Sequence, residues 1–161
     1  MGKDFGDWPA RLAEVEHRAG GSGWLNGVAE LAAESVERCG GTSVAHFDLR
    51  DDNVLITDAG QVYLCDWNWP LLGAPWVDLV CLLCSAYGDG LDADALLRRH
   101  PLSQDVDPRS VDALLANLWL YFAVVRHHEV PASSPYIRVH QAWYAEVIGR
   151  WLAARREQSL T

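Results

Sequence analysis

One short β-hairpin is the feature that most constrains how this chain can fold. Residues 54–57 and 61–65 are two runs rich in β-branched and apolar residues, and the Asp-Ala-Gly at 58–60 is typical of a tight turn. Antiparallel arms joined by such a turn bring their open ends together. We therefore expect Asn53, at the start of the first arm, to lie close to Asp66, just past the second.

Helical patterns cover most of the remaining sequence. With 161 residues, half of them hydrophobic and eight of them Trp, the chain is long enough to bury the core of one domain. We predict a single α+β domain over residues 1–161 that is mostly helical. The expected helices cover 9–18, 24–38, 75–87, 93–100, 109–128 and 136–156, with a short strand at 43–45 and an ordered loop at 67–76.

Charge and apolar runs exclude several classes of protein. The formal net charge is −9 and no basic cluster offsets it, which argues against a nucleic-acid partner. The N-terminus lacks a signal-peptide core, and the longest apolar runs are too short to span a membrane. Without a secretory context the four cysteines are expected to be reduced. We therefore expect a cytoplasmic protein.

Polar residues gather at the open end of the predicted hairpin. Asp48 lies in the loop that enters the first arm, near Asn53 and Asp66. Two oxygen ligands from adjacent strand ends suit Mg²⁺, which completes its shell with water and phosphate. Asp48 is then placed to orient a hydroxyl or to take its proton. The alternative is that these are ordinary loop residues, because Asp and Asn are common in turns.

Asp78 is surrounded by apolar residues in the segment APWVDLVCLLCSAY. A carboxylate in such a helix is costly unless several donors satisfy it. The best candidates are backbone N–H groups of the loop before Asn53. Asp78 can instead cap the start of its helix or face solvent.

Three motifs together resemble those of kinase-like phosphotransferases. The sequence HFDLRDDN at 46–53 resembles the catalytic loop H-x-D-L-x-x-x-N, and DWN at 66–68 is similar to the metal-binding D-F-G triplet. The sequence GAPWVDL at 73–79 is similar to the G-x-P-x-x-D-L of the aminoglycoside phosphotransferase family. The resemblance implies a protein-kinase-like C-terminal lobe over about residues 22–155, whose hairpin carries the catalytic loop and the metal site.

The resemblance also implies a role for each matching position. Asp48 would be the catalytic carboxylate facing the acceptor hydroxyl, and Arg50 would contact the transferred phosphoryl group. Asn53 and Asp66 would bind Mg²⁺ and, with it, the phosphoryl donor ATP. His46 and Asp78 would be structural supports of the loop. Because Trp-Asn at 67–68 departs from Phe-Gly, we expect a small-molecule acceptor and no activation switch of the protein-kinase kind.

The matching residues correspond to the C-terminal lobe only. The resemblance implies an N-lobe with a Gly-rich loop and a strand lysine, whereas Lys3 is the only lysine in this sequence. We therefore expect an ATP-dependent phosphotransferase that needs an N-lobe, in cis as part of a longer chain or in trans as a partner. The alternative is a catalytically inactive kinase-like lobe that acts as a binding or interaction module.

Overall fold

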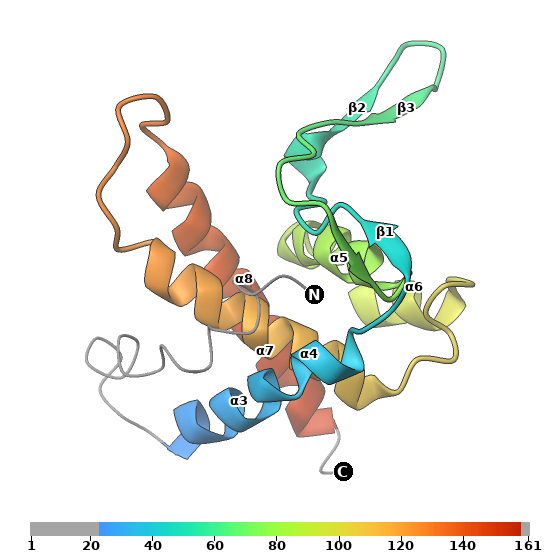
Figure 1. Ribbon diagram of the computed structural model, residues 1–161, viewed down its shortest axis with the longest axis vertical. Coiled ribbons are helices and arrows are strands. Elements are labelled where there is room, and N and C mark those ends of the chain that lie inside the picture. The colour runs from blue at the N-terminus through green and yellow to red at the C-terminus, as the bar shows by residue number, and fades with distance from the viewer. Residues whose placement is uncertain (1–22, 159–161) are drawn as a thin grey trace. The chain divides into compact units, whose positions relative to one another are not determined.

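The computed structural model describes residues 23–158, so the helix expected at 9–18 lies outside the described residues (Figure 1). The chain is α+β and mostly helical, with two small antiparallel sheets. The described residues group into two compact units, one formed by Cys39–Asp107 and the other by residues 23–38 together with 108–158. The single domain over 1–161 stays a prediction, and each unit is considered by itself below.

The first unit contains both sheets and two helices. Its elements are β1 (Ser43–Ala45), the 3-10 helix η2 (Asp51–Asn53), β2 (Val54–Ile56), β3 (Val62–Leu64), β4 (Leu71–Gly73), α5 (Val77–Gly88) and α6 (Ala93–Arg99). Strands β2 and β3 form the predicted hairpin, and Gly60 in its turn has a φ of +74°, where glycine is favoured.

The second sheet corrects the expectation of a loop at 67–76. Strand β4 lies inside that segment and pairs antiparallel with β1, with Ser43 opposite Gly73. The backbones come close at one end of this pair, because a Cβ placed on Gly41 would lie 2.3 Å from the Gly73 carbonyl oxygen. Glycine at position 41 therefore permits the approach of the two segments.

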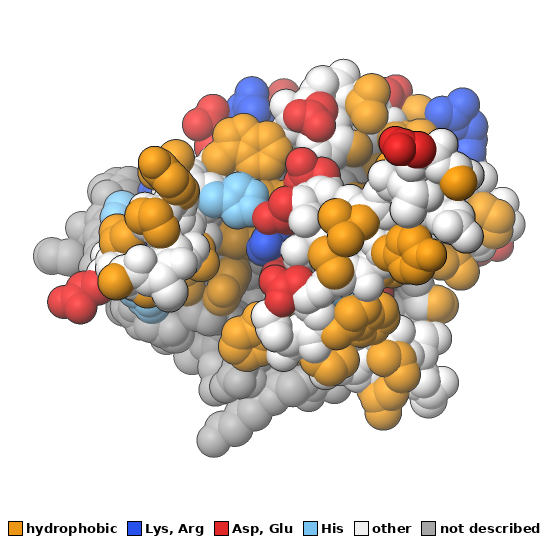
Figure 2. Space-filling model, turned by 90° about the horizontal axis from the view of Figure 1, so that it is seen from above, with side chains coloured by type: hydrophobic (Ala, Val, Ile, Leu, Met, Phe, Trp, Pro, Cys, Tyr) orange, Lys and Arg blue, Asp and Glu red, His pale blue; other side chains and the backbone are white. Residues whose placement is uncertain are grey.

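The β2–β3 hairpin exposes apolar side chains on both of its faces. Ile56 is 71% exposed and Val62 opposite it 59%, and on the other face Leu55 is 56% and Tyr63 53% exposed. Figure 2 views the molecule from the end that carries this hairpin in Figure 1, and its right-hand part shows apolar and acidic side chains side by side. The hairpin therefore does not contribute these side chains to a core within the described residues.

Helix α7 forms the centre of the second unit. This unit consists of α3 (Gly23–Ala33), α4 (Ser35–Arg38), α7 (Pro108–Val125) and α8 (Ile137–Gln158), and both α3 and α8 pack against α7. Nearly every residue of α7 is buried, as its apolar sequence predicts. The fully buried core side chains of this unit include Leu114, Leu115, Leu120, Tyr144, Ile148, Trp151 and Leu152.

The helix expected to run to Arg38 is interrupted at Glu34. The Glu34 carboxylate accepts a hydrogen bond from Arg38 at 2.6 Å and a bidentate pair of bonds from Arg109 on α7. The Arg109 and Arg38 hydrogen bonds lower the pKa of Glu34 to about 2. Beside this pair, the Asn117 side-chain amide donates to the Ser35 hydroxyl at 2.6 Å, so the junction of α3 and α4 is bound to α7 by polar contacts.

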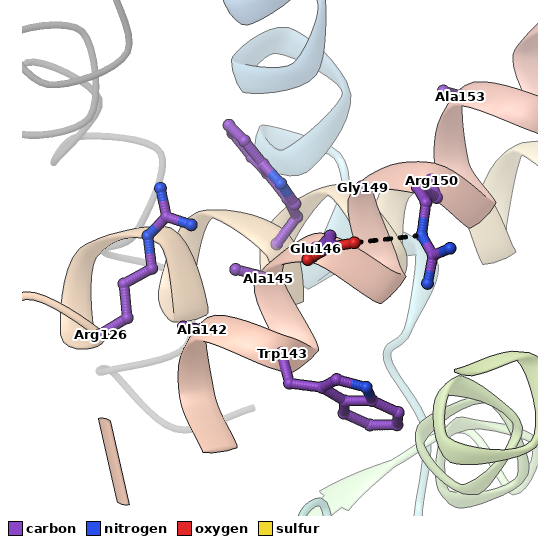
Figure 3. A pocket seen from close by; sticks show the side chains of 9 residues that line it. Arg126, Ala142, Trp143, Ala145, Glu146, Gly149, Arg150 and Ala153 are labelled. Atoms are coloured by element: carbon purple, nitrogen blue, oxygen red, sulfur yellow. Dashed lines mark ion pairs between the residues drawn. The ribbon is translucent and has the colours of Figure 1, made fainter. Parts of the chain in front are cut away.

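Helices α7 and α8 also border a pocket of about 640 Å³ (Figure 3). Its lining includes the indoles of Trp119 and Trp143 and the ion pair between Glu146 and Arg150, whose closest atoms are 3.9 Å apart. None of the site residues expected from the sequence lines this pocket. No helix within residues 23–158 is long and apolar enough to cross a membrane.

Candidate active site

The hairpin ladder brings the predicted metal ligands together. Val54 pairs with Leu64, and one step further the Cys65 N–H donates to the Asn53 carbonyl at 3.0 Å. Asp66 follows Cys65 directly, so Asn53 and Asp66 are neighbours at the base of the hairpin, as the paired arms predict. Asn53 directly precedes β2 and Asp66 follows β3 by two residues, so both lie at the same end of the ladder.

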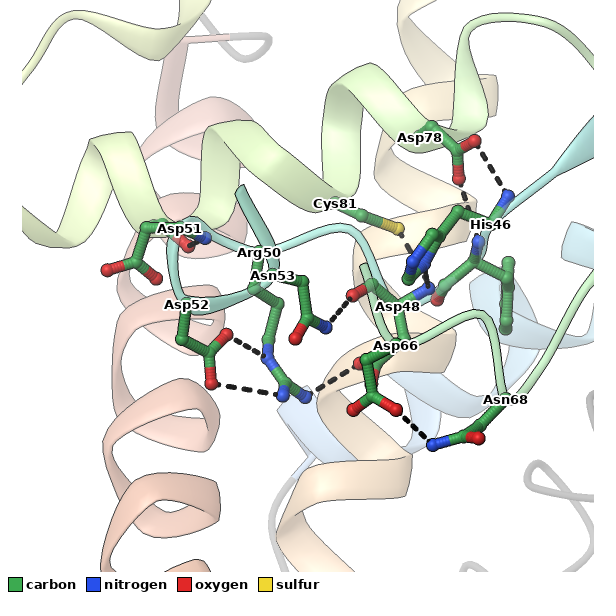
Figure 4. Close-up of polar contacts among 12 residues, drawn as sticks. His46, Asp48, Arg50, Asp51, Asp52, Asn53, Asp66, Asn68, Asp78 and Cys81 are labelled. Atoms are coloured by element: carbon green, nitrogen blue, oxygen red, sulfur yellow. Dashed lines mark hydrogen bonds and ion pairs between the residues drawn. The ribbon is translucent and has the colours of Figure 1, made fainter. Parts of the chain in front are cut away.

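Asn53 closes the loop that carries Asp48 (Figure 4). Its side-chain amide donates to the Asp48 backbone carbonyl at 2.7 Å, and the residue is only 5% exposed. Because the Nδ2 atom is committed to this bond, the direction of the side-chain oxygen is fixed as well. The loop therefore presents Asp48 and the Asn53 amide as one ordered unit.

The Asp48 carboxylate is partly buried and paired with an arginine. Arg50 Nη1 donates to Asp48 Oδ1 at 2.7 Å, and its Nε and Nη2 donate to the two Asp52 oxygens at 3.0 and 3.2 Å. Burial raises the pKa of Asp48, whereas the positive charge of Arg50 acts in the opposite direction. Asp52, which the sequence did not single out, therefore holds the guanidinium that pairs with Asp48.

His46 is completely buried and connects the loop to the second arm of the hairpin. Its Nε2 lies 2.8 Å from the Cys65 carbonyl oxygen, and its Nδ1 lies 3.3 Å from the Asp48 backbone nitrogen. A carbonyl oxygen can only accept, so Nε2 carries the hydrogen and Nδ1 accepts from the Asp48 N–H. The Trp67 ring lies against this imidazole, with the ring centroids 4.6 Å apart. His46 therefore braces the backbone of Asp48.

Asp78 anchors the start of the same loop. Its two carboxylate oxygens accept hydrogen bonds from the backbone N–H groups of His46 and Phe47, each at 2.8 Å. Phe47 has a φ of +64°, a conformation that is costly for a residue with a side chain. Of the roles left open by the sequence, the contacts show loop anchoring, and the two bonds hold Phe47 in its strained conformation.

Two further anchors on α5 were not expected from the sequence. The Cys81 thiol lies 3.9 Å from the Phe47 carbonyl oxygen, and the Asp51 N–H donates to the Ser85 hydroxyl at 3.3 Å. Positions 78, 81 and 85 share one face of the helix because they are three and seven residues apart. Residues with polar atoms at this spacing, in a helix that is otherwise apolar, are the sequence pattern that could have predicted these contacts with the loop.

The thiols of α5 are not suited to nucleophilic or metal chemistry. Cys81 and Cys84 are buried, and burial raises the pKa of both thiols above the ordinary value. A protonated, buried thiol is neither a nucleophile nor a ligand. Both thiols therefore pack as small apolar side chains, and Cys81 adds its contact with the loop.

Asp66 stands in an unusual backbone conformation. Its φ is +65°, and its carboxylate accepts a hydrogen bond from the side-chain amide of Asn68. Non-glycine residues in this region are uncommon, with Asp among the types that adopt it most readily, and they cluster at active sites. Asn68 is a further residue that the sequence did not single out, because its contact depends on the turn that Asp66 makes.

The donors at the hairpin base fit magnesium in type. The Asn53 amide oxygen and the Asp66 carboxylate are hard oxygen ligands, and Mg²⁺ is commonly bound by one or two protein oxygens together with phosphate and water. Within residues 23–158 no three His, Cys, Asp or Glu side chains are grouped to hold a metal ion. The protein ligands of such a site would be Asn53 and Asp66.

Comparison of the chain with protein-family models, with curated proteins and with solved structures finds no match. The structure shows an α+β chain in which the loop before β2 and the base of the hairpin bring Asp48 and Asn53 near Asp66, while α5 anchors the backbone of that loop. The assignment of this arrangement to a class of enzyme is a proposal.

Proposed function

We propose that the chain is the C-terminal lobe of a kinase-like phosphotransferase, which transfers the γ-phosphoryl group of ATP to a hydroxyl of a small polar molecule. The observation that carries the proposal is the convergence of Asp48, Asn53 and Asp66 at the base of one hairpin. Their backbones are linked through the Asn53 amide and through His46. Ordinary turn residues do not require the buried imidazole of His46, or the clamp that the Asp78 carboxylate forms on two backbone N–H groups, to hold them in place.

Asp48 is the group that would receive the acceptor hydroxyl. A carboxylate can accept the hydroxyl hydrogen bond, align the oxygen for attack and take its proton as the new bond forms. Because burial raises the pKa of Asp48, the carboxylate is a stronger base than an exposed aspartate. The Arg50 guanidinium, 2.7 Å from Asp48 Oδ1, favours the ionised form of the carboxylate and would also contact a phosphoryl oxygen.

Asn53 and Asp66 would hold the metal ion. Bound Mg·ATP supplies the electrophilic phosphoryl group and the charge neutralisation that its transfer needs. The part of this chain is to fix the two oxygen ligands beside Asp48, through the ladder bond at Asn53 and the turn at Asp66. The nucleotide itself would require an N-lobe, supplied in cis or in trans, as the resemblance implies.

The first experiment is the mass of the native polypeptide in its source cell, followed by an assay of that species. ADP release is measured with Mg·ATP and a panel of small hydroxyl compounds, which includes amines and sugars. We expect Asp48→Asn to abolish the acceptor-dependent release. Asp58→Asn, in the exposed turn of the hairpin, is the matched control and should keep full activity. An unchanged rate in Asp48→Asn would exclude this role for the loop.

The second candidate is an inactive kinase-like lobe that serves as a binding module. The apolar side chains exposed on both faces of the hairpin favour it, because such surfaces often mark interaction sites. The two candidates differ in a calorimetric titration of the native species, together with any N-lobe that it carries, with Mg·ATP. The phosphotransferase binds Mg·ATP, and Asp66→Asn weakens that binding; the binding module shows no heat and no thermal stabilisation.

A further inference from the structure

The outer edge of strand β2 offers backbone groups for pairing. Two backbone hydrogen bonds show which opposite residues of the hairpin bond to each other: the Cys65 N–H donates to the Asn53 carbonyl, and the Thr57 N–H donates to the Gln61 carbonyl. The residues of the alternate pairs, 54, 56, 62 and 64, therefore direct their N–H and C=O groups away from the hairpin. The Val54 N–H is taken by the Asp51 carbonyl. Along β2 the Val54 carbonyl and both backbone groups of Ile56 therefore face away from the hairpin.

The opposite edge is partly covered. The indole nitrogen of Trp67 donates to the Leu64 carbonyl at 3.1 Å, which blocks the continuation of that edge toward the hairpin base. On β2 no comparable side-chain bond is seen among the described residues, and Ile56 is 71% exposed and Leu55 56%. Two strands alone are marginally stable in water, and a third strand would cover both the backbone groups and these side chains.

Acidic residues bracket β2 at both of its ends. Asp51 and Asp52 lie just before Asn53, the residue that precedes the strand, and Asp58 follows the strand by two residues. Residues 48–58 hold four carboxylates against the single guanidinium of Arg50. A second copy of this chain would pair acidic ends with acidic ends in either strand direction, which is unfavourable. A strand with basic ends and an apolar middle is the complementary partner.

We infer that β2 is a docking edge for a strand of another polypeptide segment, apolar at its centre and carrying Lys or Arg at both ends. The strand adds to the hairpin through the backbone groups of Val54 and Ile56, and its side chains cover Ile56 and Leu55. Its basic residues meet Asp58 at one end and the acidic pair before β2 at the other. The inference does not depend on phosphotransfer, because the side chains of Asp48, Asn53 and Asp66 take no part in the proposed strand pairing.

The test uses a fluorescent synthetic peptide, Lys-Lys-Thr-Val-Thr-Val-Thr-Lys-Lys, and the full chain. Fluorescence anisotropy measures binding, and residue-resolved hydrogen exchange follows the Ile56 amide. We expect saturable binding that slows exchange at Ile56. The same peptide with alternate amides N-methylated, and a version with Glu in place of Lys, should each bind at least about tenfold more weakly, since each loses backbone bonds or charge complementarity.

Two proline variants distinguish the edges. Ile56→Pro removes an outward N–H of β2 without removing a bond of the ladder, and Val62→Pro does the same on β3. Ile56→Pro should weaken binding about tenfold and Val62→Pro should not, with retained exchange protection at Thr57 showing that the hairpin is folded. If Ile56→Pro unfolds the hairpin, the N-methylated peptide tests the same bonds on the unaltered protein.

Three results would overturn the inference. Equal binding of the N-methylated peptide excludes strand addition, and equal binding of the acidic peptide excludes the charge complementarity. Concentration-dependent dimers that protect Ile56 without any peptide would assign the edge to a second copy of the chain. None of these results bears on Mg·ATP binding, so failure here is distinguishable from failure of the proposed enzyme.

Discussion

Removal of the Asp78 carboxylate should destabilise the loop that carries Asp48. Asp78→Ala deletes two charge-assisted hydrogen bonds of 2.8 Å to backbone N–H groups. Such bonds contribute about 1.5–3 kcal/mol each, and the site is half-buried, so we expect the free energy of unfolding to fall by about 3 kcal/mol. Asp78→Asn keeps one acceptor oxygen and should lose roughly half of that amount.

The left-handed conformation of Phe47 sharpens this prediction. Its φ of +64° costs on the order of 1 kcal/mol and persists because Asp78 holds both the Phe47 N–H and the N–H of the preceding residue, His46. Without the clamp the residue should return to an extended conformation. The Asp48 backbone then loses its bond to His46, so hydrogen exchange of the Asp48 amide should accelerate more than that of amides in α7.

The assay is urea unfolding of the full chain followed by tryptophan fluorescence, with the midpoint and slope compared among variants. Asp89→Asn is the matched control, because Asp89 is exposed at the end of the same helix and should change stability by less than about 0.5 kcal/mol. If Asp78→Ala also stays within that margin, the clamp does not stabilise the loop and the reasoning from its geometry is refuted.

Three other predictions concern pH and packing. Because burial raises the pKa of Asp48, the acid limb of a pH–rate profile should lie above the ordinary aspartate value of 3.8; a midpoint at or below that value would contradict the assignment. The pKa of Glu34 is depressed to about 2 by Arg109 and a second arginine, so its contribution to stability is complete above about pH 4.5 and is lost as the pH falls toward 2. Glu34→Gln should remove that part of the acid unfolding curve, measured by circular dichroism. Gly41→Ala should lower the midpoint of urea unfolding, because the new Cβ would lie 2.3 Å from the Gly73 carbonyl oxygen and one of the two backbone segments would have to move. An unchanged midpoint would show that the two segments separate without a cost in stability.

The hairpin and the main helices could be predicted because their signals are local. Turn residues between two short apolar arms specify β2 and β3, and helical spacing of apolar residues specifies α7 and α8 within a few residues. Strand β4 was missed because it is three residues long and lies among Pro, Gly and Trp. Its partner β1 lies far back in the sequence, so no local sequence pattern predicts that the two strands pair.

The candidate site was predictable in part for the same reason. The proximity of Asn53 and Asp66 follows from strand pairing alone. The contacts of Arg50 with Asp52 and of Asn68 with Asp66 depend on side-chain rotamers, which residue spacing does not specify. The roles of these residues in catalysis stay predictions.

The turn at the tip of the hairpin has a practical consequence. The loop that carries Asp48 is tethered to α5 through Asp78 and Ser85. The turn at 58–60 is exposed, and the Gly60 N–H bonds back to the Thr57 carbonyl within the hairpin. Exposed loop tips of this kind tolerate insertions. A peptide tag or a fluorophore grafted after Ala59 should therefore report on partners of the hairpin while the anchored loop keeps its geometry.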